Sequence, residues 1–112
     1  MNEPTEAQIK EFWEWCGFWQ DTYDKGLWRF PDGYTVAGEL LPIDLNNLFK
    51  YAVPFLQDKG YMVELFSYEH KGYKVKVYNI IGQVDIPIVI TKDDDPALAL
   101  FWALWQVKEI SK

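Results

Sequence analysis

The first apolar pattern along the chain predicts a helix over about residues 5–16. Thr5 and Gln8 have the spacing of a capping box, and Gly17 stands where a helix usually ends. Apolar side chains recur at helical spacing and share one broad arc, opposite a charged side. We expect this tryptophan-rich arc to be buried, and it comprises Ile9, Phe12, Trp13, Trp15 and Cys16.

Residues 17–43 lack a sustained apolar period and are predicted to be mostly irregular. Within them, Phe30-Pro31-Asp32-Gly33-Tyr34 predicts a turn, because proline presets φ and glycine accepts a positive φ. Residues 28–30 and 34–36 have the pattern of a short hairpin about this turn.

A second helix is predicted over about residues 45–59, with Asp44 as its N-cap and Gly60 as its C-terminal stop. Pro54 removes the hydrogen bond to the carbonyl of Lys50. Because the apolar period continues through Pro54, we predict one kinked helix and not two helices. Its predicted apolar face comprises Leu45, Leu48, Phe49, Ala52 and Leu56.

An antiparallel meander of three strands is predicted next. Residues 61–67 and 73–79 alternate between apolar and polar, and the three-residue loop His70-Lys71-Gly72 pairs Leu65 with Val77. A loop with an odd number of residues keeps the apolar residues of both strands on one face, whereas a four-residue loop would divide them between the two faces.

The third strand is predicted to follow a loop with an even number of residues around Ile81-Gly82, which places its apolar residues on the same face. Pro87 cannot donate a ladder hydrogen bond, which favours the sheet edge for this strand. The predicted apolar face comprises Val63, Leu65, Val75, Val77, Val84, Ile86, Ile88 and Ile90. The predicted opposite face comprises Glu64, Phe66, Tyr68, Lys74, Lys76, Tyr78 and Asp85.

The last helix is predicted over residues 96–110. The aspartates at 93–95 cap its free amides, and Pro96 occupies its first turn. The residues predicted to face the core are Ala97, Leu100, Phe101 and Leu104. A second flank is our candidate interaction surface, within which Trp102 lies farthest from the core stripe, and it comprises Leu98, Trp102 and Trp105.

Together these patterns predict an α+β fold in the order α-loop-α-β-β-β-α, with helices packed on a three-stranded antiparallel meander sheet. We expect a single domain over residues 1–112, with an αβββα core at about 44–110. The first helix either covers the second face of the sheet or packs beside the last helix.

Composition narrows the possible functions. The net charge of −6 has the wrong sign for generic nucleic-acid binding, and aspartates occupy the helix start at which double-stranded RNA-binding domains place basic residues. No apolar run approaches bilayer length. The acidic start Met1-Asn2-Glu3-Pro4 differs from a signal peptide, so we expect a cytoplasmic protein without membrane or nucleic-acid partners.

We find no motif that indicates catalysis, a cofactor or a metal ion. His70 is the only histidine and is expected at an exposed hairpin tip, and Cys16 fits a small buried apolar residue. Asp93, Asp94 and Asp95 lack the alternating spacing of calcium ligands, so helix capping explains them better. We therefore predict no catalytic residue, no cofactor site and no metal site.

Two segments resemble a family of uncharacterised phage and prophage proteins. They are Leu45-Asn46-Asn47-Leu48-Phe49-Lys50-Tyr51-Ala52-Val53-Pro54 through Gly60-Tyr61, and Asp95-Pro96-Ala97-Leu98-Ala99-Leu100-Phe101-Trp102-Ala103-Leu104. With the strands between them, roughly residues 28–110 are similar to the phage ABA-sandwich domain. The resemblance implies helices on both sides of a sheet, and the family brings no activity to transfer.

The sequence therefore predicts a small, acidic, non-catalytic protein, associated with a phage or prophage, that binds another protein or itself. One alternative is an enzyme with its site in the 17–43 segment, which a deep polar pocket around Asp21, Asp24, Arg29 and Asp32 would support. The other alternative is an acidic decoy of a DNA-binding protein, which requires carboxylates gathered on one face.

Overall fold

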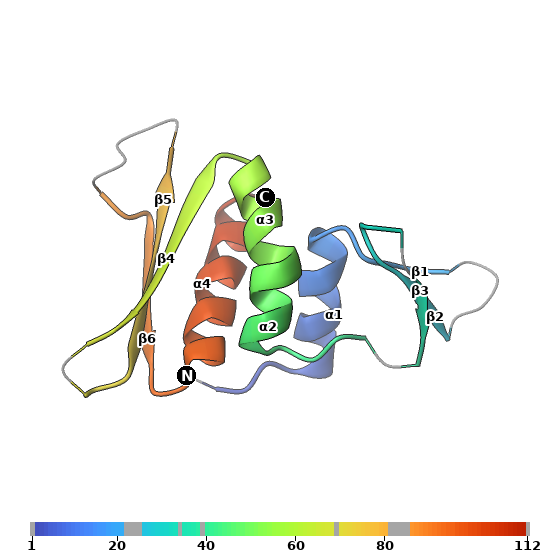
Figure 1. The fold of residues 1–112 in the computed structure, drawn as a ribbon, viewed down its shortest axis with the longest axis horizontal. Helices are drawn as coiled ribbons and strands as arrows, with labels where there is room; N and C mark the ends of the chain where they lie inside the picture. The colour runs from blue at the N-terminus through green and yellow to red at the C-terminus, as the bar shows by residue number, and fades with distance from the viewer. Residues whose placement is uncertain are drawn as a thin grey trace. The chain divides into compact units, whose positions relative to one another are not determined.

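The chain folds into two compact units in a computed structural model, one of residues 4–42 and the other of residues 1–3 with 43–112. Each unit contains helix and antiparallel sheet, so the fold belongs to the predicted α+β class (Figure 1). The structure describes residues 2–21, 26–33, 35–38, 40–68, 70–80 and 86–111. The elements are α1 (Glu6–Trp15), β1 (Trp19–Gln20), β2 (Leu27–Arg29), β3 (Thr35–Ala37), α2 (Leu45–Asn47), the π-helix η1 (Leu48–Ala52), α3 (Val53–Asp58), β4 (Tyr61–Ser67), β5 (Tyr73–Asn79), β6 (Val89–Asp93) and α4 (Pro96–Ile110).

The 4–42 unit is organised around α1, which begins with the predicted capping box. The Thr5 hydroxyl accepts a hydrogen bond from the Gln8 amide at 3.1 Å, and the Gln8 side chain accepts one from the Thr5 amide at 2.9 Å. The Trp13 ring is buried, and its centre lies 5.0 Å from the centre of the Phe18 ring. The Trp13 indole N–H donates a hydrogen bond to the Leu41 carbonyl at 2.9 Å. These aromatic residues therefore supply the core of their own unit.

The segment that we predicted to be mostly irregular holds a three-stranded antiparallel sheet in the order β1-β2-β3. The hairpin about the predicted turn is present, with Arg29 opposite Thr35. Strand β2 begins one residue earlier than the pattern suggested, and β3 begins one residue later. The pattern does not reveal β1, because a strand of two residues offers no alternation to detect.

The predicted second helix is present as α2, η1 and α3 in succession. Its N-cap is Asp44, whose carboxylate accepts a hydrogen bond from the Asn47 amide at 2.8 Å. A π-helical segment, η1, precedes Pro54. Its wider turn rotates the side chains that follow about the helix axis, relative to a regular α-helix. As a result Val53 is buried, whereas Phe49, which we predicted on the apolar face, is 44% exposed.

Strands β4, β5 and β6 form an antiparallel sheet in that order, as predicted. The register is two residues away from our prediction, because Leu65 pairs with Val75 and not with Val77. The three-residue turn lies one residue earlier, around His70. A shift of two residues keeps side chains on their predicted side, so Val63, Leu65, Val75 and Val77 do share one face.

Our prediction for the third strand is wrong. Strand β6 places Val89 and Thr91 on the apolar face, opposite Val77 and Val75, and leaves Ile90 on the other face with 49% exposure. The predicted strand residues Ile86 and Ile88 precede β6 and are exposed. The remaining predicted positions, Val84, Asp85 and the Ile81-Gly82 loop, lie outside the described residues.

A hydrogen bond explains why a threonine takes the core position in β6. The buried Thr91 hydroxyl donates to the Ala99 carbonyl of α4 at 2.6 Å, so its polar group is satisfied in the interior. Among the described residues β6 pairs with β5 alone, so it is an edge strand as predicted, although Pro87 itself precedes the strand.

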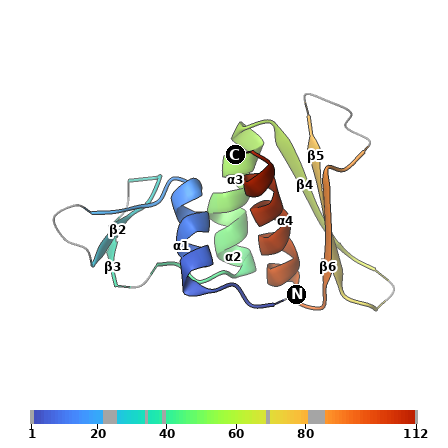
Figure 2. The same ribbon diagram turned by 180° about the vertical axis from the view of Figure 1, so that it is seen from behind.

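Helix α4 has the predicted bounds, and Asp95 caps it by accepting a hydrogen bond from the Ala97 amide at 2.8 Å. Figures 1 and 2 show that α4 and the α2-η1-α3 segment lie on the same side of the β4-β5-β6 sheet. They cover the face that holds Val75 and Val77, which are fully buried. Among the described residues of this unit, no helix lies over the other face.

Candidate binding surface

The side of the β4-β5-β6 sheet turned away from α4 is basic and aromatic. We call it the open face, and its residues are Met62, Glu64, Phe66, Tyr68, Lys74, Lys76, Tyr78, Ile90 and Lys92. The strand register orders them in rows across the sheet. One row places Lys74 between Phe66 and Lys92, near the β4–β5 turn, and Met62 lies opposite Tyr78 at the far end. The open face therefore has a basic end and an apolar end.

Three lysine ammonium groups of the open face lie over aromatic rings. The ammonium of Lys74 is 5.2 Å from the centre of the Tyr68 ring, and that of Lys92 is 5.7 Å from the same ring. The ammonium of Lys76 is 5.5 Å from the centre of the Phe66 ring. Within the described part of the chain, none of these three lysines forms an ion pair.

Glu64 is the one carboxylate among the described residues of the open face. It stands opposite Lys76 in the β4–β5 register, yet its recorded hydrogen bond is the one donated by the Tyr78 hydroxyl at 3.4 Å. Desolvation, together with the negative charge of Glu64 and this hydrogen bond, raises the pKa of Tyr78. Tyr78 therefore stays a neutral hydroxyl at physiological pH.

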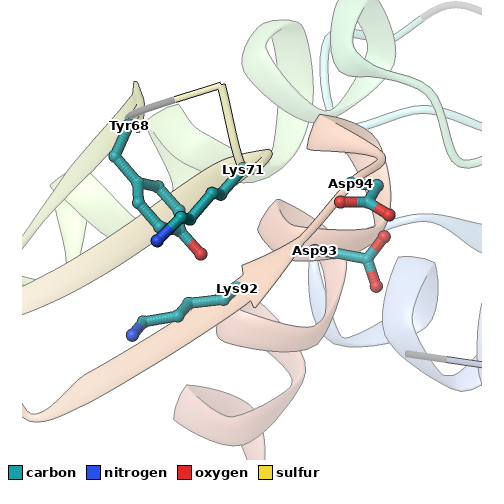
Figure 3. Close-up of a pocket in the computed structure, with 5 residues that line it drawn as sticks. All are labelled: Tyr68, Lys71, Lys92, Asp93 and Asp94. Carbon is teal, nitrogen blue, oxygen red and sulfur yellow. The ribbon is translucent and has the colours of Figure 1, made fainter.

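A shallow depression of about 370 Å³ lies at the basic end of the open face. Figure 3 shows the Tyr68 ring and the Lys71 and Lys92 side chains on one side of it, while the carboxylates of Asp93 and Asp94 point the other way. Alternation along β6 separates Lys92 from Asp93, because consecutive strand residues project to opposite faces, whereas Asp94 follows the end of the strand. Positive charge is therefore presented on the open-face side.

The interaction surface that the sequence predicted is engaged within its own unit. Leu98 is buried with 9% exposure, and Trp102 and Trp105 are half-buried. The Trp102 indole N–H donates to the Asn2 carbonyl at 2.8 Å, and the Lys108 ammonium lies 4.2 Å from the centre of the Trp105 ring. Both tryptophans thus have intramolecular partners.

The residues that we weighed for chemistry have structural surroundings. His70 is exposed in the β4–β5 turn, as predicted. Cys16 is buried, as predicted, and burial raises the pKa of its thiol. Asp95 caps α4, and Asp93 accepts a hydrogen bond from the Asp95 amide at 2.8 Å. Across the described residues, no three side chains of metal-binding type cluster together.

Two charged residues of the 17–43 segment, Asp21 and Arg29, link neighbouring strands. Arg29 donates from Nε and Nη2 to one carboxylate oxygen of Asp21, at 3.0 and 2.7 Å. Asp21 is buried and directly follows β1, so this pair links β1 to β2. Asp32 is exposed, and Asp24 lies outside the described residues.

Sequence reasoning found six of the nine open-face positions. It did not name Met62, and it missed Ile90 and Lys92 because it assigned the wrong face to β6. A usable signal was present in the strand itself. A lysine in the middle of an edge strand belongs on the side that water reaches, so Lys92 fixes the alternation and places Thr91 in the core.

No helix within the described residues is long and apolar enough to cross a bilayer. Comparisons of the chain with models of known protein families, with curated proteins and with solved structures gave no match.

Proposed function

We propose that the protein is a small non-catalytic binding module that acts by contacting another protein through the open face. The observation that carries this proposal is the set of lysines on that face. In a chain with a net charge of −6, Lys74, Lys76 and Lys92 gather on one sheet face without an ion pair to any described residue. A lysine cluster that forms no ion pair with the described residues of an acidic protein is the kind of feature that a binding partner complements.

The apolar and aromatic side chains of the open face support the same proposal. Phe66 and Tyr78 are half-buried, and Met62 and Ile90 are exposed large apolar residues on the same face. Such residues supply much of the energy at protein interfaces, where they are covered on binding. The open face therefore combines the charge and the apolar area that a protein partner requires.

The setting of this function is part of the proposal. A phage or prophage origin follows from the resemblance of residues 45–54 and 95–104 to the ABA-sandwich proteins. A cytoplasmic location suits Cys16, a buried free thiol of the kind that a reducing compartment maintains.

The alternatives draw less support from the structure. The enzyme hypothesis required a deep polar pocket around Asp21, Asp24, Arg29 and Asp32. Of these residues, Arg29 pairs with Asp21 and Asp32 is exposed. The acidic-decoy hypothesis requires gathered carboxylates, whereas the open face gathers lysines. Self-association through the flank of α4 is the alternative form of binding, and a dimer in light scattering that is lost in Trp102→Ala would favour it.

Site-specific photo-crosslinking tests the proposed function. A benzophenone amino acid replaces Ile90 on the open face, or Phe49 on η1 as a control, in the full chain expressed in cells that naturally carry the gene. The two positions have similar exposure, 49% and 44%, so they offer equal access to a partner. We expect a discrete crosslinked protein from position 90 that is absent from position 49.

A second variant ties the crosslink to the lysines. Adding Lys74→Glu to the chain labelled at position 90 is expected to remove the product, because it reverses the charge at the centre of the basic row. The absence of a product at position 90, or equal products from both positions, would contradict the proposal.

A further inference from the structure

We propose, building on the proposed function, that the partner of the open face is a protein segment with carboxylates at one end and apolar side chains at the other. The open face is itself divided in this way. The row that runs from Phe66 through Lys74 to Lys92 lies beside the β4–β5 turn, and Met62 and Tyr78 pair at the opposite end. A partner of matching polarity satisfies both ends in one orientation.

Two lysines lie directly opposite each other on neighbouring strands at the basic end, so this end favours the binding of an anion. Lys74 and Lys92 are cross-strand neighbours, and like charges in this arrangement destabilise a sheet. The carboxylates of Asp93 and Asp94 are nearby in sequence but point away from the lysine side chains (Figure 3). A carboxylate from outside the chain, placed on the open face between the ammonium groups of Lys74 and Lys92 near the Tyr68 ring, would relieve this repulsion.

The apolar end of the open face favours a protein over a nucleic acid. Met62 at this end is 42% exposed, and Ile90 in the next row, opposite Lys76, is 49% exposed. A phosphodiester backbone has no apolar groups to cover these side chains. Two of the three aromatic rings on which bases could stack, Phe66 and Tyr68, already have lysine ammonium groups within 5.8 Å of their centres. The net charge of −6 also repels a polyanion at long range.

The partner segment need be only about as long as the strands that it meets. Strands β4 and β5 have seven residues each, so an extended segment of about eight residues spans the open face from the basic to the apolar end. Charge at one end and apolar groups at the other are the features that the segment requires.

NMR titration of the isotope-labelled full chain tests this inference with a defined probe. The probe is a synthetic peptide of about eight residues, with glutamates in one half and leucine and phenylalanine in the other. We expect the peptide to shift the amide resonances of Lys74, Ile90 and Lys92 and to leave those of α2 unchanged. Raising the salt from about 50 to about 500 mM should weaken binding several-fold, because exposed charges are screened.

Matched variants and probes complete the experiment. Lys74→Glu should weaken binding about ten-fold or more, whereas Lys10→Glu, which makes the same change in net charge on α1, should leave it unchanged. A peptide with glutamine in place of glutamate should bind as weakly as the Lys74→Glu variant does. The absence of shifts at Lys74 and Lys92 at millimolar peptide, or equal binding by the glutamine peptide, would overturn the inference.

Other outcomes separate this inference from the proposed function. If a dT oligonucleotide of about eight nucleotides shifts the same amides more strongly than the peptide does, the occupant is a nucleic acid and both proposals fail. If light scattering shows a dimer that Lys74→Glu dissociates, the occupant is a second copy, and only the inference about an acidic segment fails. If crosslinking at Ile90 captures a protein while the peptide does not bind, the inference likewise fails and the proposed function stands.

Discussion

Lys74 and Lys92 face each other directly across the β5–β6 ladder, on the side of the sheet opposite α4. Each ammonium lies within 5.7 Å of the Tyr68 ring centre, and neither forms an ion pair with a described residue. The arrangement costs stability, since like charges in opposed positions repel. A local feature that lowers stability is typical of a functional site.

The first prediction concerns the stability cost of this pair. Replacing Lys92 by Glu should raise the free energy of unfolding by about 0.5 kcal/mol, because it turns a repulsive cross-strand pair into an attractive one. The gain is limited by the loss of the Lys92 contact with the Tyr68 ring. Urea unfolding followed by circular dichroism measures the change.

Two further measurements complete this first prediction. Lys92→Gln should give a smaller gain, because it removes the repulsion without adding an attraction. The same Lys92→Glu variant should lose binding to the acidic–apolar peptide, so stability and binding change in opposite directions. A Lys92→Glu protein that is less stable than the parent would contradict the prediction, because the contact of Lys92 with the Tyr68 ring would then outweigh the repulsion between the two lysines.

A second prediction concerns Gly72, which lets the β4–β5 turn approach the end of β6. Its φ of +112° is a conformation that side chains rarely adopt, and a Cβ atom there would lie 2.8 Å from the carbonyl oxygen of Asp93. Gly72→Ala should therefore lower the free energy of unfolding by about 2–3 kcal/mol, of which about 1 kcal/mol comes from the backbone and the rest from the clash.

Gly33 is the matched control for this substitution. It has a similar φ of +93°, but a Cβ atom there would meet no atom within 4 Å. Gly33→Ala should cost only the backbone share, about 1 kcal/mol. Equal losses in the two variants, measured by urea unfolding, would show that the approach to Asp93 is unimportant.

The elements that sequence reasoning located well are those whose signals are local. The capping box at Thr5 and the aspartate before Pro96 mark the starts of α1 and α4, because capping depends on neighbours a few residues away. The paired faces of β4 and β5 also followed from alternation alone. The predicted faces are correct although the predicted register is wrong by two residues, because a shift of two residues leaves every side chain on the same face.

The elements that sequence reasoning missed depend on contacts that are distant in the chain. The face of β6 is decided by the hydrogen bond from Thr91 to Ala99, and a pattern that favours isoleucine over threonine in the core points the wrong way. The burial of Val53 in place of Phe49 follows from the π-helical segment before Pro54, which no periodicity of 3.6 residues reveals. The lysine pair of the open face became visible only with the correct β6 register.

A third prediction separates helix capping from metal binding in the aspartate run. Asp95→Ala should lower the free energy of unfolding by about 1 kcal/mol, because the carboxylate accepts hydrogen bonds from the Ala97 and Leu98 amides. Asp95→Asn should be nearly neutral, since asparagine is also a good N-cap. Asp94→Ala, the neighbouring control, should have a smaller effect.

Calcium provides the contrasting measurement for this third prediction. A site built from the three aspartates would raise the melting temperature on addition of the ion, and both alanine variants would abolish the increase. We expect the melting temperature of the parent protein to be the same with and without calcium. A calcium-dependent increase would contradict capping as the sole role of these residues.

The last prediction concerns the reactivity of Cys16. The thiol is 2% exposed at the C-cap of α1, and burial raises its pKa, so the reactive thiolate is scarce in the folded protein. A colorimetric thiol reagent should modify the native protein at least about a hundred-fold more slowly than the urea-unfolded chain, which has the same single cysteine.

The pH dependence of the modification rate provides a second measurement of Cys16. Raising the pH from about 7 to about 9 should strongly increase the rate at which the thiol of the unfolded chain is modified, because an ordinary thiol titrates near pH 8.5. The intrinsic reactivity of the folded thiol should not show this titration, because its raised pKa keeps it protonated over the same interval. Rapid modification of the native protein with a midpoint near pH 8.5 would show instead that Cys16 is accessible.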